Sequence, residues 1–565
     1  MNKHLIITLL LLFLSVLSAE IMQIRINDQN KDIINWLKKI EATEIRSFEN
    51  GIEAYMDDEY LDYLNDNNIP FSIISTESEW QRNIGDYSTY DQIVTELNDI
   101  AAANPDFIEL FSLGTTLGHQ YYDTGYVNYE DFQYDIWCVK LSDNPQINED
   151  EPNTFMVGGI HSNEPTSIEV DMHILLHLVN NYGVDSLVTK LINESQIWFI
   201  PLMNPDGYRM VRDLGYMGHR KNIRDNNGNG VPDGAVYESY GIDGVDLNRN
   251  FGYTYGGNPN TWSPAYNGTN AWSEPEVVNI RDLLRSHKFW GGITYHSTRQ
   301  SVLYPLGNYS SAMAYDHYIM QDLAEDMANT IPRRNSSGIQ TGYYNFEQAN
   351  CLVASGTMGD WGYCELRLFS FTLELCWTDI PPANLLQVLC EDNLEAALIF
   401  LDRVHHSTVT GNITDETRSP VVAEIYVQEI DFEAGMTSVE PVRSDSTFGR
   451  YYRVLLPGTY TFTFSLEGYD DIVVEDVVVN DSTQTELNIT FGSLTFVEDV
   501  SISFTGNSVE LSWQLEEGFD YEVYSSDLPY SEFQLDLDGI LEGNSWQKTI
   551  SEAREFYKVR KIPSF

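Results

Sequence analysis

The sequence predicts an α/β domain with a mixed central sheet flanked by helices, preceded by a small α+β domain and followed by two all-β sandwich modules. Helical patterns alternate with apolar, strand-like segments between about residues 87 and 404, as they do in layered α/β domains. A shorter unit of strands and helices precedes this region, and only short alternating strands follow it. A chain of 565 residues is also too long for a single core.

The start of the chain has the pattern of an export signal, which we place at residues 1–19. A polar start precedes an apolar run from Leu5 to Leu17, and the small residues Ser18 and Ala19 follow. The run is short for a helix that spans a bilayer, and no later stretch has enough apolar residues for one. We therefore expect a secreted protein, extracellular or periplasmic, without membrane insertion.

Residues 20–84 are predicted to form a prosegment-like α+β domain that ends in a polar linker. Its segments follow the order strand, helix, strand region, helix, strand, at residues 21–26, 32–40, 44–56, 58–68 and 71–75. A domain of this size before a larger one acts either as an inhibitory prosegment or as a folding aid. The sequence leaves both interpretations open.

The region after His406 consists of short alternating strands separated by turn residues. This pattern is typical of all-β sandwiches. We place one sandwich at residues 405–492 and a second, fibronectin-like β-module at residues 493–565. Neither contains a cluster of metal-binding or nucleophilic side chains.

The chain is strongly acidic. Its net charge of −53 comes from 85 acidic and 32 basic residues. Such a surface repels nucleic acid and anionic membranes and favours solubility, so we expect no nucleic-acid partner. The sequence does not determine the oligomeric state, and its five cysteines allow at most two disulfides.

Three residues have the types and positions of a zinc site. A zinc hydrolase needs three protein ligands and one open position for water. His161 and Glu164 lie three residues apart directly after a strand-like segment, and His296 ends a second such segment. Because strand ends meet at one edge of an α/β sheet, we expect the three side chains to converge. The HxxE pattern alone is weak, since it also arises by chance.

The motifs around these residues resemble the zinc carboxypeptidases of the A/B and N/E family. Between residues 85 and 404, that family's order is followed by the segments GGIHSNEP, FIPLMNPDGY, HRKNIR, GVDLNRNF, SEPE, ITYHS and FTLEL. The resemblance implies a catalytic domain at residues 85–404 with one zinc ion held by His161, Glu164 and His296. It also implies that residues 405–492 form the transthyretin-like sandwich that follows the catalytic domain in the N/E branch.

The same resemblance implies roles in peptide hydrolysis. Glu374 falls at the position of the general base, which later donates the proton, and Arg220 at the residue that polarises the scissile carbonyl. Asn248 and Arg249 fall at the clamp for the substrate's terminal carboxylate, which a planar guanidinium fits well. The pocket-lining positions fall on Thr294, Leu303, Gly307, Ala354, Gly359 and Thr372. None of these is acidic, so the resemblance implies a preference for apolar or aromatic C-terminal residues.

The stretch DNNGNGVPD resembles calcium loops in which oxygen-bearing side chains alternate around a glycine turn. The candidate calcium ligands are Asp225, Asn227, Asn229 and Asp233. Val236 stands where such loops carry a final glutamate, and an ordinary turn is the alternative interpretation.

The sequence therefore predicts a secreted zinc metallocarboxypeptidase that acts on peptide or protein C-termini through a zinc-activated water and a glutamate base. Leu352 stands where the family has a tyrosine that contacts the substrate, which predicts a weakened enzyme. One alternative is a carboxypeptidase of cell-wall peptides, which would use the same zinc chemistry. The other is a catalytically impaired binding homologue, and only Leu352 favours it.

Overall fold

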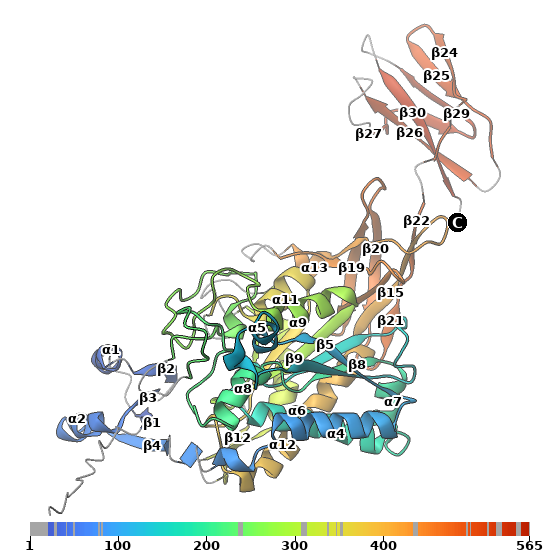
Figure 1. Cartoon of the computed structure of the whole chain (residues 1–565). Helices are drawn as coiled ribbons and strands as arrows, with labels where there is room; N and C mark the ends of the chain where they lie inside the picture. The colour runs from blue at the N-terminus through green and yellow to red at the C-terminus, as the bar shows by residue number, and fades with distance from the viewer. Residues whose placement is uncertain are drawn as a thin grey trace, which may run out of the picture.

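The structure is a computed structural model that describes residues 21–27, 31–40, 42–48, 51–76, 79–80, 83–234, 241–306, 314–335, 338–345, 347–350, 354–432, 439–492, 495–497, 499–516, 519–526, 534–549 and 555–563. The expected signal at residues 1–19, the pocket position Gly307 and the position of Leu352 lie outside the described residues. Figure 1 shows the remaining parts in chain order, from a small N-terminal domain (blue) to a β-module at the opposite end (red).

The N-terminal domain contains an antiparallel four-stranded sheet and two helices, in the order of elements that the sequence predicts. Its elements are β1 (Ile21–Ile26), α1 (Lys31–Lys39), β2 (Thr43–Phe48), β3 (Gly51–Asp57), α2 (Leu61–Asp66) and β4 (Phe71–Thr76). The strand order is β2-β3-β1-β4. Ile24, Leu37, Ile52 and Leu64 come from four of these elements and are all buried in one core, which belongs to this domain.

The next part is built on an eight-stranded mixed sheet with the order β13-β10-β14-β9-β7-β8-β6-β5. Its strands are β5 (Ile108–Thr115), β6 (Asp135–Leu141), β7 (Asn153–Val157), β8 (Gln196–Ile200), β9 (Phe289–His296), β10 (Ser301–Tyr304), β13 (Glu347–Asn350) and β14 (Phe369–Glu374). The central strands β8, β7, β9 and β14 are parallel. The pairs β5–β6, β6–β8 and β10–β14 are antiparallel, which confirms a mixed sheet.

Helices cover both faces of this sheet (Figure 1). One layer contains α4 (Tyr90–Ala103), α6 (Thr166–Asn181), α7 (Ser186–Asn193), α10 (His317–Thr330) and α12 (Leu386–Asp402). The other contains α9 (Pro275–Ser286) and α11 (Met358–Leu366). Shorter elements in the connections are α5 (Leu117–Asp123), α8 (Pro205–Arg212), β11 (Pro332–Arg334) and β12 (Gln340–Asn345).

The alternation of side chains along the strands divides the interior into two cores. On β9, Ile293 and Tyr295 belong to the core beneath α6 and α12. On β7, Phe155 and Val157 belong to the core beneath α9 and α11, whereas Met156 faces the first core. Since successive side chains of a strand point to opposite faces, the two cores lie on opposite faces of the sheet. His296 reaches the sheet edge because it is the last residue of β9.

The C-terminal part contains two all-β units. The first combines β15 (Thr408–Asp415), β18 (Arg450–Val454), β21 (Gln484–Glu486) and β22 (Ile489–Phe491) with a second sheet of β16 (Glu424–Val427), β17 (Val442–Arg443), β19 (Gly458–Ser465) and β20 (Ile472–Val479). The second has the sheets β23-β30-β26-β27 and β24-β25-β29-β28, built from β23 (Thr495–Phe496), β24 (Ser501–Thr505), β25 (Ser508–Ser512), β26 (Phe519–Ser526), β27 (Gln534–Leu535), β28 (Ile540–Glu542), β29 (Ser545–Thr549) and β30 (Phe556–Pro563). These units and the α/β domain confirm the predicted fold class.

A buried ion network fastens the first sandwich to the α/β domain. Arg453 on β18 and Arg367 after α11 both bind Asp316, which precedes α10, and Asp431 in α13 (Gln428–Asp431). Burial alone would raise the pKa of Asp316, but Arg453 and Arg367 hold it at about 2. The apolar core is also continuous between the two parts. The sandwich is therefore an integral part of the molecule.

Two further expectations concern membranes and cysteines. None of the described helices is long and apolar enough to cross a bilayer. Of the five cysteines, four lie in the described part, and Cys138, Cys364, Cys376 and Cys390 are all buried free thiols.

Candidate active site

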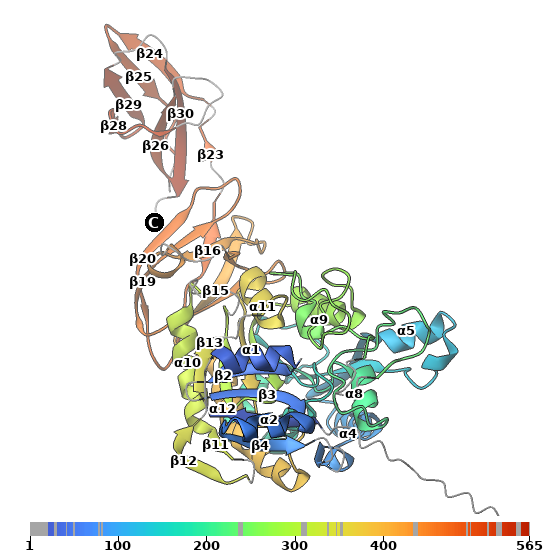
Figure 2. The same ribbon diagram turned by 90° about the vertical axis from the view of Figure 1, so that its left-hand side faces the viewer.

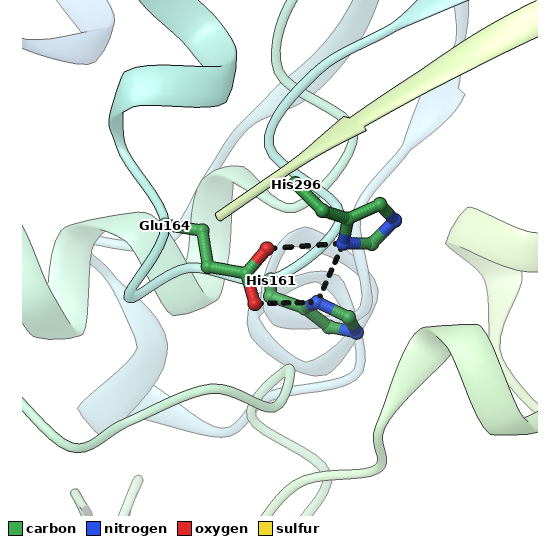
Figure 3. A group of neighbouring side chains, drawn as sticks. All are labelled: His161, Glu164 and His296. Carbon is green, nitrogen blue, oxygen red and sulfur yellow. Dashed lines mark hydrogen bonds and ion pairs between the residues drawn. The ribbon is translucent and has the colours of Figure 1, made fainter. Parts of the chain in front are cut away.

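The three predicted metal ligands converge at the carboxyl end of the parallel strands. His161 and Glu164 lie between β7 and α6, and His296 is the last residue of β9. His161 Nδ1 lies 3.0 Å from Glu164 Oε1, and His296 Nδ1 lies 3.0 Å from Glu164 Oε2 and 2.9 Å from His161 Nδ1 (Figure 3). Four polar atoms of buried side chains thus point at one another, as expected of ligands that share one cation.

The protonation of Glu164 and His296 also suits a metal. Burial alone would raise the pKa of Glu164, but the His161 and His296 rings hold it well below its ordinary value. Burial, assisted by the adjacent His161, lowers the pKa of His296 to about 4. A carboxylate and a neutral imidazole are the forms that bind zinc. The donor set of two histidines and one glutamate therefore fits Zn²⁺, and sulfur ligands are not required.

Asp246, which the sequence motifs alone did not indicate as a site residue, lies beside His161. Asp246 Oδ1 lies 3.1 Å from His161 Nε2, the ring nitrogen that faces away from Glu164. A carboxylate in this position fixes the ring orientation and tautomer of a metal-binding histidine. In the sequence, Asp246 could have been found only as the aspartate of the GVDLNRNF motif, two residues before Asn248.

Glu374 lies beside the metal ligands because β14 and β9 are parallel neighbours. Glu374 ends β14 and is in register with His296, which ends β9. On the other side of β14, Ser301 of β10 is in register with Glu374. The predicted base therefore occupies the same row of the sheet as the third ligand.

The other predicted polar residues surround this row. Arg220 Nη1 lies 2.8 Å from Glu164 Oε1, and Arg220 Nε lies 3.2 Å from Asp246 Oδ2. Asn248 and Arg249 belong to a single turn, η4 (Leu247–Arg249). The side-chain nitrogen Nδ2 of Asn248 lies 3.5 Å from His296 Nε2. The structure thus brings Arg220 and Asn248 to the metal ligands. Their catalytic roles remain predictions.

The Arg249 turn is attached to the segment before α11. Asn248 Oδ1 accepts a hydrogen bond from Met358 N at 2.9 Å, and Phe251 N donates one to Gly356 O at 3.1 Å. A Cβ atom on Gly356 would lie 2.3 Å from the Arg249 carbonyl oxygen, and Gly356 has φ +68°. Only glycine fits this close approach without strain.

Three of the predicted pocket residues lie in register with one another, in the row two residues away from Glu374 and His296 on the same face of the sheet. Thr294 on β9 and Leu303 on β10 are both register partners of Thr372 on β14. The Thr294 and Thr372 hydroxyls lie 3.0 Å apart. Gly359 is buried on α11, and Ala354 is half-buried in the segment before that helix. The row below Glu374 thus carries two hydroxyls and a leucine, and no carboxylate.

The predicted calcium residues form a closed loop in which backbone amides donate to the Asp225 carboxylate and side-chain amides donate to the Asp233 carboxylate. Asp225 Oδ1 accepts hydrogen bonds from Gly228 N at 2.6 Å and Asn229 N at 3.2 Å, and Oδ2 accepts one from Gly230 N at 2.8 Å. Asp233 Oδ2 accepts hydrogen bonds from the side-chain amides of Asn227 and Asn229. Calcium binding here stays a prediction.

Comparison with known proteins agrees with the fold and the ligand set. Residues 93–396 match the family described as zinc carboxypeptidase, Peptidase M14. The chain belongs to this family, and His161, Glu164 and His296 form its zinc site.

Individual relatives cover the chain to different extents. Mouse carboxypeptidase D is 26% identical over 413 residues, which are 70% of this chain and 26% of that protein. The mouse carboxypeptidase N catalytic chain is 25% identical over 405 residues, which are 67% of this chain and 80% of that one. This chain thus spans about a quarter of the length of carboxypeptidase D. The crystal structure of thrombin activatable fibrinolysis inhibitor shares the fold, with a TM-score of 0.54, 19% identity and coverage of 68% of this chain and 98% of that one.

Proposed function

We propose that this protein is an exported zinc metallocarboxypeptidase that hydrolyses the C-terminal peptide bond of peptides and proteins. One observation carries the proposal. The ligands His161, Glu164 and His296 converge within one buried group, and Glu374 ends the strand next to His296. A metal-binding triad beside a carboxylate is the arrangement that hydrolysis by an activated water requires.

The residues have distinct chemical tasks in this proposal. His161, Glu164 and His296 would hold the zinc ion, which when bound would lower the pKa of a coordinated water to about 7 and polarise the scissile carbonyl. Glu374 takes the proton from the attacking water and returns it to the departing amine nitrogen. The Arg220 guanidinium donates hydrogen bonds to the carbonyl oxygen as that oxygen gains negative charge.

The exopeptidase character comes from Asn248 and Arg249. Arg249 is only partly buried, and its Nη1 donates to the Asn248 carbonyl oxygen at 2.7 Å, so the guanidinium is held at the turn next to the metal ligands. A guanidinium with parallel donors pairs well with a free carboxylate. A substrate held in this way presents its last peptide bond to the site.

The preferred C-terminal residue is apolar or aromatic. Leu303, Thr294 and Thr372 line the next row of the sheet without any carboxylate. A terminal Lys or Arg would have to bury its charge there without an acidic partner, which is unfavourable.

The test uses purified protein and a panel of N-blocked dipeptides with different C-terminal residues. Hydrolysis of Phe- and Leu-terminated substrates is expected, together with its loss on chelation and its recovery with Zn²⁺. Turnover of a cell-wall peptide but of no N-blocked dipeptide would reassign the substrate. Zinc binding without any hydrolysis would indicate a binding homologue. For export, the amino-terminal sequence of the protein recovered outside the cell is expected to begin near residue 20.

A further inference from the structure

The segment that follows Glu374 accepts hydrogen bonds from side chains in the N-terminal part of the chain. Residues 377–380, here called the Asp379 segment, begin three residues after Glu374. Four side chains from residues 21–83 hydrogen-bond to four successive residues of it. These contacts are Gln23 Nε2 to Trp377 O at 3.0 Å, Trp80 Nε1 to Thr378 Oγ1 at 3.1 Å, Tyr55 OH to Asp379 Oδ2 at 3.0 Å and Asn83 Nδ2 to Ile380 O at 3.2 Å.

This contact is buried and partly apolar. Tyr55 is 4% exposed and Trp80 is fully buried, although the latter lies in the stretch that the sequence suggested to be a polar linker. Both pack in one apolar cluster with Ile84, Tyr87, Val211, Met217 and Ile380. The N-terminal domain is therefore docked on the α/β domain through a buried, partly apolar contact (Figure 1, Figure 2).

The opposite side of the Asp379 segment contacts the zinc motif. Asp379 Oδ2, which accepts the Tyr55 hydroxyl, also accepts a hydrogen bond from Asn163 Nδ2 at 3.1 Å. Asn163 lies between the ligands His161 and Glu164 in the sequence. The side chains of Asn163, Asp379 and Tyr55 are all buried.

A second connection joins the same segment to the ligands. Ser297 Oγ donates a hydrogen bond to the Asp379 carbonyl oxygen at 3.4 Å, and Ser297 N donates one to Glu164 Oε2 at 3.0 Å. Asp379 is thus bound to both sides of the zinc site, through Asn163 and through Ser297. Ser297 is a direct partner of the ligand Glu164, and removal of such direct partners typically lowers metal affinity by about 10- to 100-fold. Asp379 acts one step further out, on Asn163 and Ser297.

We propose that Tyr55 is a positioning residue for the zinc site, which acts through Asp379 on the turn that carries His161 and Glu164. The N-terminal domain is then a working part of the enzyme, whose removal loosens the metal, and not a segment that must leave for the site to act. The proposal rests on the zinc site and not on the substrate preference proposed above.

The first experiment uses the full-length protein with the change Tyr55→Phe, which removes one hydroxyl and keeps the ring in its cluster. The rate of zinc release to a chromogenic chelator is expected to rise about tenfold. The visible spectrum of the cobalt-substituted protein is expected to change, because the ligand geometry becomes less fixed. Tyr63→Phe is the matched control, since Tyr63 belongs to the same domain and is 42% exposed. It should leave both quantities unchanged.

A second variant separates positioning from general destabilisation. Asp379→Ala removes the acceptor of both hydrogen bonds and is expected to speed zinc release at least as much as Tyr55→Phe. The double variant should release zinc no faster than Asp379→Ala alone, because Tyr55 acts through Asp379. Strictly additive effects would contradict the proposal. So would a Tyr55→Phe protein with unchanged zinc release and cobalt spectrum, or a higher turnover after proteolytic removal of the N-terminal domain. Because no readout in the two variants needs a substrate, failure of the proposed peptidase activity would not decide this test.

Discussion

Glu374 and His296 are register partners at the ends of the neighbouring parallel strands β14 and β9. This pairing places a candidate general base beside a metal ligand although 78 positions separate the two in the sequence, from 296 to 374. The strand pairing thus determines both the metal site and the location of the base. Two residues before each of them, Thr294 and Thr372 form the corresponding pair on the same face of the sheet.

The role of Glu374 is tested by Glu374→Gln. The variant keeps the shape of the side chain but cannot accept the proton from water, so turnover is expected to fall by about 10² to 10⁴. Zinc content, measured by atomic absorption, should stay the same because Glu374 is not a ligand. Glu365→Gln is the control, since Glu365 pairs with the half-exposed Arg285 at 2.9 Å on the surface of α11. Near-normal turnover of Glu374→Gln would place the base elsewhere.

Asp246→Asn should weaken zinc binding. The change removes the carboxylate that lies 3.1 Å from His161 Nε2, and a lost partner of this kind lowers metal affinity by about 10- to 100-fold. Competition with a chelator of known affinity measures the change. Asp282→Asn, on the exposed side of α9, should not alter it. An unchanged zinc affinity would show that Asp246 does not orient the ring.

The ion network between the α/β domain and the first sandwich is tested by Arg453→Met. The change leaves the buried Asp316 and Asp431 with one cation fewer, which typically destabilises a protein by about 3 to 5 kcal/mol. Arg450→Met is the matched control on the same strand, because Arg450 pairs with the more exposed Asp150 and near-surface pairs contribute about 0 to 1 kcal/mol. Chemical denaturation measures the free energy of unfolding of both variants. An equal decrease in the free energy of unfolding for Arg453→Met and Arg450→Met would contradict the larger contribution assigned to the buried network.

Glu151 is expected to make stability depend on pH. Burial and the neighbouring Glu149 and Asp143 raise its pKa from 4.5 to about 8. Between these values the folded protein holds a proton that the unfolded chain releases, so its contribution to the free energy of unfolding falls as the pH rises from about 4.5 to 8.

Glu151→Gln removes this titration. Relative to wild type, the variant should be more stable at pH 8 than at pH 5, as measured by the difference in Tm at each pH. The exposed Glu130 provides the control Glu130→Gln. A stability difference that is the same at both pH values would contradict the raised pKa.

The sequence was sufficient to predict the metal ligands, which lie at or directly after strand ends. His161, Glu164 and His296 follow apolar segments, and the convergence of such ends is a general property of parallel sheets. Asp246 was missed because only the folded chain brings it to His161, 85 positions away. The contact between Tyr55 and Asp379 spans 324 positions and has no local signal.

The short strands were also difficult to predict. β10 and β13 have four residues each, too few for an alternation pattern to be distinguished from a loop. Trp80 illustrates the same difficulty, since its polar neighbours in the sequence suggested a linker, whereas its ring is buried in a cluster formed by distant residues. Predictions were therefore best where the pattern was local.

The most direct test of the account compares one N-blocked peptide ending in Phe with the same peptide amidated at its C-terminus. We predict that the zinc enzyme cleaves the free peptide and barely cleaves the amide, because a charge-assisted pair that loses one partner costs about 2 to 5 kcal/mol. Arg249→Ala should lose most of this discrimination, and Arg249→Lys, which keeps the charge but not the planar pair of donors, should retain part of it. Equal cleavage of the free and amidated peptides by the wild-type enzyme would contradict the assignment as a carboxypeptidase.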